Sequence, residues 1–162
     1  MLARIAEGVD AEDLAAHGIS VRIGDDRAEH RWVADAPRNV YSVSKGVCAI
    51  AIGMAIDDGL LTWGTRVPEL LGPLDLGAGV DEVTIEHLLR MRSGIDFAWF
   101  GHQDVPWSDL GREMLRRPAA GIGAVFQYSD ASTYVAMRML GEIVGDVRDW
   151  LVPRFFEPLG VA

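Results

Sequence analysis

Ser42 and Lys45 lie three residues apart at the start of a predicted helix. This spacing places both side chains on one helix face, within reach of each other. A serine hydroxyl becomes a strong nucleophile when a neighbouring group takes its proton. A lysine can take that proton where burial lowers its pKa, because desolvation disfavours the charged ammonium. At the positive end of the helix dipole, the Ser42 backbone N–H is free to donate to a developing oxyanion.

The alternative interpretation of this pair is a surface lysine behind a serine helix cap. The cation composition bears on the choice, since the chain has fourteen arginines and Lys45 is its one lysine. An arginine could not accept the serine proton, because its guanidinium stays protonated in proteins. We therefore expect Lys45→Arg to abolish acylation in a complete enzyme while leaving the charge in place.

A third candidate lies in the segment Phe126-Gln127-Tyr128-Ser129-Asp130, directly before a helix predicted over 131–144. A tyrosine beside a lysine loses its proton more readily and can act as a general base. Taken alone, the segment is equally typical of a packed aromatic residue followed by a helix cap at Asp130.

Composition excludes several other classes of function. The net charge of −9 and a pI near 4.8 argue against nucleic-acid or anionic-membrane partners. Cys48 is the one cysteine and is expected to be an inert packed thiol, and the histidines at 17, 30, 87 and 102 lack metal-ligand spacing. We expect no cofactor and no metal.

The N-terminus does not resemble a signal peptide, so a cytoplasmic location is expected.

Strands are predicted over 19–23 and 28–33, joined by the turn Gly24-Asp25-Asp26-Arg27, and 11–16 is predicted to end a short helix. A two-stranded hairpin is marginal in water, so either helices cover it or strands are missing. Apolar residues all round 47–56 predict a helix buried on every side. The predicted helices are 42–57, 84–91, 108 or 109–117, 131–144 and 147–156.

Four motifs together resemble the serine β-lactamase-related hydrolases, most closely the class C branch with its esterases, D-amino-acid peptidases and linear-amide hydrolases. The resemblance covers roughly Gly18 to the last residue and keeps the family order. The matching segments are Tyr-Ser-Val-Ser-Lys-Gly from Tyr41, Val83 to Ile95 with its Met-Arg-Ser-Gly-Ile, Phe126-x-Tyr128-Ser129-Asp130, and Phe156-Glu157-Pro158-Leu159-Gly160-Val161.

The resemblance implies an α+β, β-lactamase/transpeptidase-like fold: one partial domain over 1–162, with antiparallel strands at about 19–33 and a helical region at about 42–162. Ser42 would be the acylated nucleophile. Lys45 would accept or shuttle its proton, and Tyr128 would act as general base and then general acid. The substrate would be a small-molecule ester or amide, with a β-lactam, peptide or linear amide among the possibilities.

Two departures from the family pattern qualify this expectation. Asp130 stands where the family usually has Asn, and an ionised Asp only accepts hydrogen bonds. Its carboxylate would favour the charged form of Lys45 and would repel a substrate carboxylate. The sequence also contains no Lys-Thr-Gly or His-x-Gly strand, which in the family supplies the second oxyanion donor. We therefore expect a truncated sheet. The alternative is an inactive remnant that binds a partner or self-associates through an open sheet edge.

Overall fold

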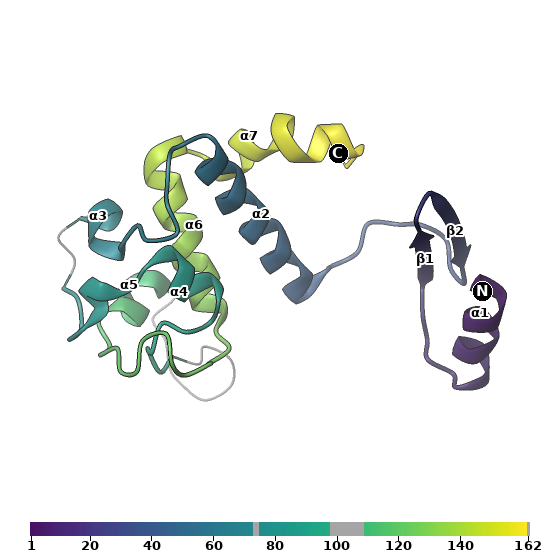
Figure 1. Cartoon of the computed structure of the whole chain (residues 1–162), viewed down its shortest axis with the longest axis horizontal. Coiled ribbons are helices and arrows are strands. Elements are labelled where there is room, and N and C mark those ends of the chain that lie inside the picture. The colour runs from purple at the N-terminus through teal and green to yellow at the C-terminus, as the bar shows by residue number, and fades with distance from the viewer. Residues whose placement is uncertain (73–74, 98–108, 162) are drawn as a thin grey trace. The chain divides into compact units, whose positions relative to one another are not determined.

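The computed structural model describes residues 1–72, 75–97 and 109–161 (Figure 1). Contacts divide the chain into an N-terminal unit, Met1–Val40, and a helical unit, Tyr41–Ala162. The expected α+β composition is confirmed, with an antiparallel pair of strands followed by a predominantly helical region.

The N-terminal unit consists of α1 (Leu2–Ala11) and the hairpin of β1 (Gly18–Ile23) and β2 (Asp26–Arg31). Ile23 pairs with Asp26, so the turn is the dipeptide Gly24-Asp25, and Gly24 has a φ of +60°. Glycine occupies this left-handed conformation without the steric cost of a side chain. The predicted hairpin is therefore confirmed, with the second strand beginning and ending two residues earlier than expected.

A short helix does precede the hairpin, but the prediction that it ends within 11–16 needs correction, because α1 ends at Ala11 and no helix follows before β1. Asp13 and Ala15 have φ values of +49° and +48°. A right-handed helix cannot continue through left-handed residues, so this segment forms the turn toward the hairpin.

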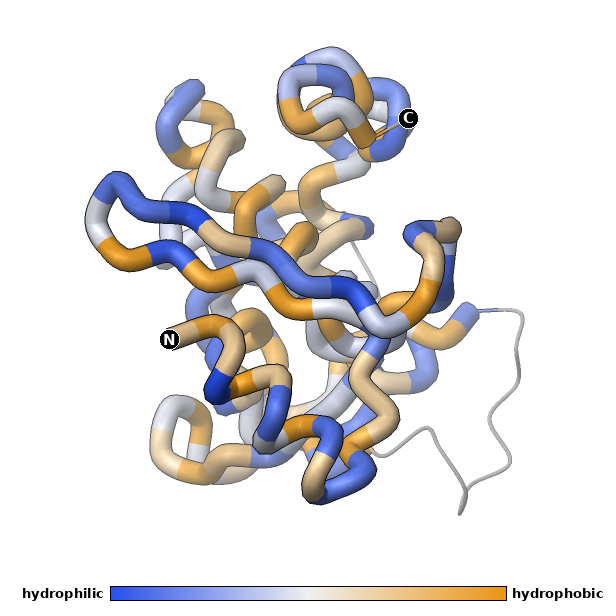
Figure 2. The backbone as a smooth tube through the Cα atoms, turned by 90° about the vertical axis from the view of Figure 1, so that its right-hand side faces the viewer, coloured by the Kyte–Doolittle hydropathy of each residue, from blue (hydrophilic) through white to orange (hydrophobic). Residues whose placement is uncertain are grey.

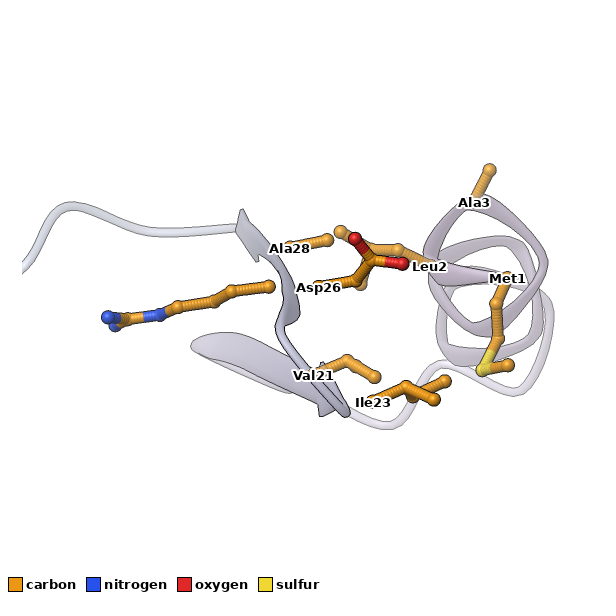
Figure 3. Close-up of a pocket in the computed structure, with 8 residues that line it drawn as sticks. Met1, Leu2, Ala3, Val21, Ile23, Asp26 and Ala28 are labelled. Atoms are coloured by element: carbon orange, nitrogen blue, oxygen red, sulfur yellow. The ribbon is translucent and has the colours of Figure 1, made fainter.

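Apolar side chains gather between α1 and the hairpin. β1 alternates apolar and polar residues whereas β2 is largely hydrophilic, as Figure 2 shows. Met1 and Leu2 face Val21 and Ile23 across a cavity of about 480 Å³ (Figure 3). At the other end of α1, the indole N–H of Trp32 donates to Asp10 Oδ1 at 2.6 Å. Helix α1 thus covers part of the hairpin.

The helical unit is built around α6, which packs against α2, α3, α4, α5 and α7. Its helices are α2 (Ser44–Asp57), α3 (Val67–Leu71), α4 (Ile85–Leu89), α5 (Leu110–Leu115), α6 (Asp130–Val144) and α7 (Val147–Leu151), with shorter helical turns at Tyr41–Val43, Val80–Glu82, Val152–Phe156 and Glu157–Leu159. The fully buried side chains include Ile52, Ile85, Leu88, Phe97, Met114, Met139 and Leu140. Helix α3 was not predicted from the sequence.

Helix α2 is confirmed, but the expectation that it is buried on every side is wrong. Ala51, Ile52 and Ala55 are fully buried, whereas Ile50 is 45% exposed. An apolar residue on α2 is therefore not always a buried residue. The fully buried residues belong to the part of α2 that packs in the core, where α2 meets α6.

Two further helix predictions need correction. Ser129, not Asp130, is the N-cap of α6: its backbone is extended, with φ −149° and ψ 125°, and Asp130 is the first helical residue. The helix expected over 147–156 changes at Val152 into a π-helical turn that contains Pro153, which has no N–H to donate. The cap at Asp109 is confirmed, since its side chain accepts from the Arg112 N–H at 2.9 Å, and Ser108 lies outside the described residues.

We predict that Ile52→Ala destabilises the chain by about 2–5 kcal/mol, the usual cost of removing a buried isoleucine side chain. Ile50→Ala, on the exposed face of the same helix, should cost under about 1 kcal/mol. Urea unfolding followed by circular dichroism measures both. Equal losses of unfolding free energy in the two variants would show that the Ile50 side chain is packed, which would contradict its exposure.

Candidate active site

Ser42 lies in the single helical turn Tyr41–Val43 that leads directly into α2. Tyr41 has a φ of +47°, an uncommon conformation for a residue with a side chain, and it directly precedes Ser42. The Ser44 hydroxyl donates to the Tyr41 carbonyl at 2.7 Å. The backbone around Ser42 is thus held at the point where the helix begins.

Lys45 connects Ser42 to α6. Its ammonium donates to Ser42 Oγ at 3.1 Å and also donates to Asp130 Oδ1. The Lys45 side chain is 16% exposed and that of Asp130 28% exposed. Lysine and aspartate therefore form a partly buried ion pair between the first turns of two helices.

Tyr128 completes the group from the loop before α6. Its hydroxyl donates to Ser42 Oγ at 2.6 Å, and its ring centroid lies 4.8 Å from the Lys45 ammonium. The side chain is half-exposed. Ser42, Lys45, Tyr128 and Asp130 are all brought together, and Ser42 Oγ accepts hydrogen bonds from two of the others.

Segment 91–97 holds the loop on both sides of Tyr128. The Gln127 N–H donates to the Met91 carbonyl at 2.8 Å, and the Ser129 hydroxyl donates to the Phe97 carbonyl at 3.0 Å. Sequence reasoning assigned Ser129 no more than a place in a helix cap and did not consider Gln127. The contacts join residues about thirty positions apart, which no local pattern signals.

The charge balance at Lys45 corrects one expectation. Burial acts to lower its pKa, as predicted, but hydrogen bonds with Asp130 and Tyr128 and the Asp130 charge act the other way. The pKa of Lys45 is therefore raised above its ordinary value. The Asp130 carboxylate and the Tyr128 hydroxyl thus favour the charged ammonium of Lys45, against the effect of burial.

Tyr128 shows the opposite response. Interaction with Lys45, followed by that with Ser42, lowers the pKa of the Tyr128 phenol below its ordinary value, although the Asp130 charge opposes this. The ammonium favours the phenolate because opposite charges attract. Of the two candidate bases, Tyr128 is the one whose proton is made easier to remove.

A cavity of about 290 Å³ adjoins the ion pair. Lys45 and Asp130 line it together with Cys48, Thr133 and Met137. Cys48 is partly buried, and burial raises the pKa of its thiol. This agrees with the expected inert thiol, since only the thiolate is a good nucleophile.

The described residues outside this group include His87, for which a structural role was expected. Thr84 is the N-cap of α4, and its Oγ1 accepts from the His87 N–H at 3.3 Å. The His87 ring returns a bond, since its Nδ1 accepts from the Thr84 N–H at 3.3 Å, in line with the structural role expected for His87. Among the described residues, no group of three or more histidine, cysteine, aspartate or glutamate side chains could hold a metal ion. No helix of that part of the chain is long and apolar enough to cross a membrane.

The model of the Beta-lactamase family matches residues 3–162. The chain therefore belongs to this family, as its motifs suggested. No curated protein matches it.

Solved structures show the same fold. A class C β-lactamase in complex with cefoxitin is 18% identical with a TM-score of 0.75, covering 96% of this chain and 47% of its own. A D-stereospecific amidohydrolase from Streptomyces sp. is 20% identical with a TM-score of 0.73, covering 95% and 53%. A penicillin-binding-protein homologue from Caulobacter crescentus is 25% identical with a TM-score of 0.64, covering 80% and 37%. The chain spans about half the length of these structures or less.

We predict that Asp130→Asn lowers the pKa of Lys45, because burial then acts without the opposing carboxylate. Lys45 is the one lysine in the chain, so carbon-13 lysine labelling gives a single side-chain resonance to titrate. Asp109→Asn is the matched control, since Asp109 pairs with Arg138 at 2.6 Å and should leave Lys45 unchanged. An unchanged Lys45 midpoint in Asp130→Asn would contradict the ion pair.

Proposed function

We propose that this chain carries the nucleophile region of a serine hydrolase that forms an acyl-enzyme at Ser42. The observation that carries the proposal is the Ser42 hydroxyl, which accepts one hydrogen bond from Lys45 and another from Tyr128. A serine placed between an ammonium and a phenol of lowered pKa has the neighbours that activate a nucleophile.

In the first step the Tyr128 phenolate takes the Ser42 proton while Ser42 Oγ bonds to the substrate carbonyl carbon. The carbonyl oxygen becomes an oxyanion, toward which the Ser42 backbone N–H can donate. Tyr128 then gives its proton to the leaving alcohol or amine as that bond breaks. Water attacks the resulting ester, Tyr128 takes a proton from the water, and Ser42 recovers its proton as the acid leaves.

Lys45 in this scheme supplies a fixed positive charge instead of accepting the proton, so the reason given above for loss of acylation in Lys45→Arg does not apply to it. Its ammonium stabilises the Tyr128 phenolate through the short distance to the ring and holds Ser42 Oγ by a hydrogen bond. Asp130 keeps that ammonium charged and in place. The base role is therefore assigned to Tyr128, and Asp130 acts through Lys45.

Asp130 also bears on the substrate class. A carboxylate close to the nucleophile disfavours substrates that bring a carboxylate of their own, as β-lactams do. Neutral esters or amides suit this site better. Related solved structures include a D-stereospecific amidohydrolase as well as class C β-lactamases, so both substrate classes occur on this fold.

A second candidate function is a binding or self-associating module without catalysis. Residues 1–162 contain no Lys-Thr-Gly or His-x-Gly motif, the segment expected to carry the second oxyanion donor. Removing one such donor typically lowers turnover by about 10² to 10³. Acylation at Ser42 by a strongly electrophilic reagent separates the two candidates.

We expect a fluorophosphonate to form one covalent adduct with the chain, detected by intact mass spectrometry. Ser42→Ala should abolish the adduct. Ser20→Ala, which removes an exposed hydroxyl on β1, should retain it. No adduct on the unmodified chain would favour the non-catalytic module. An adduct that survives in Ser42→Ala would place the nucleophile elsewhere.

The substrate preference predicts a second comparison. A short-chain nitrophenyl ester should acylate Ser42 faster than a chromogenic cephalosporin, and Asp130→Asn should improve the cephalosporin relative to the ester by about tenfold. The replacement removes the repelling charge and keeps a side chain of similar size. Faster reaction of the cephalosporin with the unmodified chain would rule out the proposed preference for neutral substrates.

A further inference from the structure

We propose that segment 91–97 positions the proposed general base, through a clamp of three hydrogen bonds that fixes the loop on each side of Tyr128. The clamp consists of Asp96 with Gln127 on one side, the Gln127 backbone with Met91, and Ser129 with the Phe97 carbonyl on the other side. This inference deepens the proposed function and rests on it, because it assigns positioning residues to the same site.

The first side of the clamp is Gln127, the residue directly before Tyr128. Its side-chain amide donates to Asp96 Oδ1 at 2.5 Å, and its backbone N–H donates to the Met91 carbonyl at 2.8 Å. Both bonds reach the same short segment. Together they fix the position and the orientation of the peptide that enters Tyr128.

The second side is Ser129, the residue directly after Tyr128. Its side chain is buried, and its hydroxyl donates to the Phe97 carbonyl at 3.0 Å. Although Ser129 is the N-cap residue of α6, its side chain makes no capping hydrogen bond. A serine at this position ordinarily accepts from the helix N–H groups. Here the hydroxyl is used across the fold instead, which argues for a positioning role.

Segment 91–97 is itself well anchored. Ile95 and Phe97 are fully buried, and the Gly94 carbonyl accepts from the Ala120 N–H at 2.8 Å. The Arg117 guanidinium lies 4.9 Å from the Phe97 ring and donates to the Asp96 carbonyl at 3.3 Å. A segment anchored in this way can hold the neighbouring loop around Tyr128 in place.

Tyr128 needs such support because its own side chain is half-exposed and is not held by packing. Its hydroxyl must stay within hydrogen-bond reach of Ser42 Oγ and near the Lys45 ammonium. A displacement of about 1 Å at a reacting group can cost about a hundredfold in rate. Without the clamp, the phenol would lose its contact with Lys45 and regain the properties of an exposed tyrosine.

The test is an ultraviolet titration of the Tyr128 phenol in the intact chain, which requires no reaction at Ser42. Subtracting the spectrum of a Tyr128→Phe background isolates this residue from Tyr41 and Tyr134. The ionisable groups that face the phenol are Lys45 on α2 and Asp130 on α6, and both stay unaltered. Asp96 is exposed, so Asp96→Ala should fold; Ser129→Ala is the second variant, and circular dichroism checks both.

We expect Asp96→Ala and Ser129→Ala each to raise the Tyr128 titration midpoint toward the ordinary tyrosine value of about 10. Asp96→Asn keeps the acceptor oxygen for Gln127 and should leave the midpoint where it is. Three results would overturn the clamp. The Tyr128 titration midpoint of the unmodified chain could lie at the ordinary tyrosine value, it could fail to rise in a folded alanine variant, or it could rise equally in Asp96→Asn. Failure to acylate Ser42 would instead count against the proposed function alone.

Discussion

The ion pair between Lys45 and Asp130 is the interaction on which the arrangement of the site depends. It joins the first turn of α2 to the first turn of α6, the two helices that pack together at the centre of the helical unit. Ser42 lies two residues before the start of α2, and Tyr128 lies two residues before the start of α6. The ion pair and the packing of α2 on α6 therefore bring Ser42 and Tyr128, the proposed nucleophile and base, together.

That charge arrangement divides the proposed chemistry between the two candidate bases. A carboxylate against Lys45 raises the lysine pKa, whereas the ammonium lowers the pKa of the Tyr128 phenol. In the proposed scheme the same carboxylate also disfavours anionic substrates. The Asp at position 130, where the family pattern has Asn, would then act on both the proposed proton transfer and the proposed substrate preference.

The sequence predicted much of this site and less of what supports it. Ser42, Lys45 and Tyr128 were recognisable because their motifs are local, and the helices at α2, α4 and α6 have clear signals. Burial and the Asp130 carboxylate were expected to act on the Lys45 pKa in opposite directions, and the contact between these residues, 85 positions apart, decides that the pKa is raised. The contacts of Gln127 and Ser129 with segment 91–97 depend likewise on tertiary structure that no spacing reveals.

The most direct test of the central claim is the rate of fluorophosphonate adduct formation at Ser42 as a function of pH. If Tyr128 is the base and Lys45 a fixed cation, the rate should rise with pH with a midpoint below the ordinary tyrosine value of about 10. Tyr128→Phe should react slowly and lose that midpoint. A Tyr128→Phe chain that kept both the rate and the pH profile would contradict the account and return the base role to Lys45.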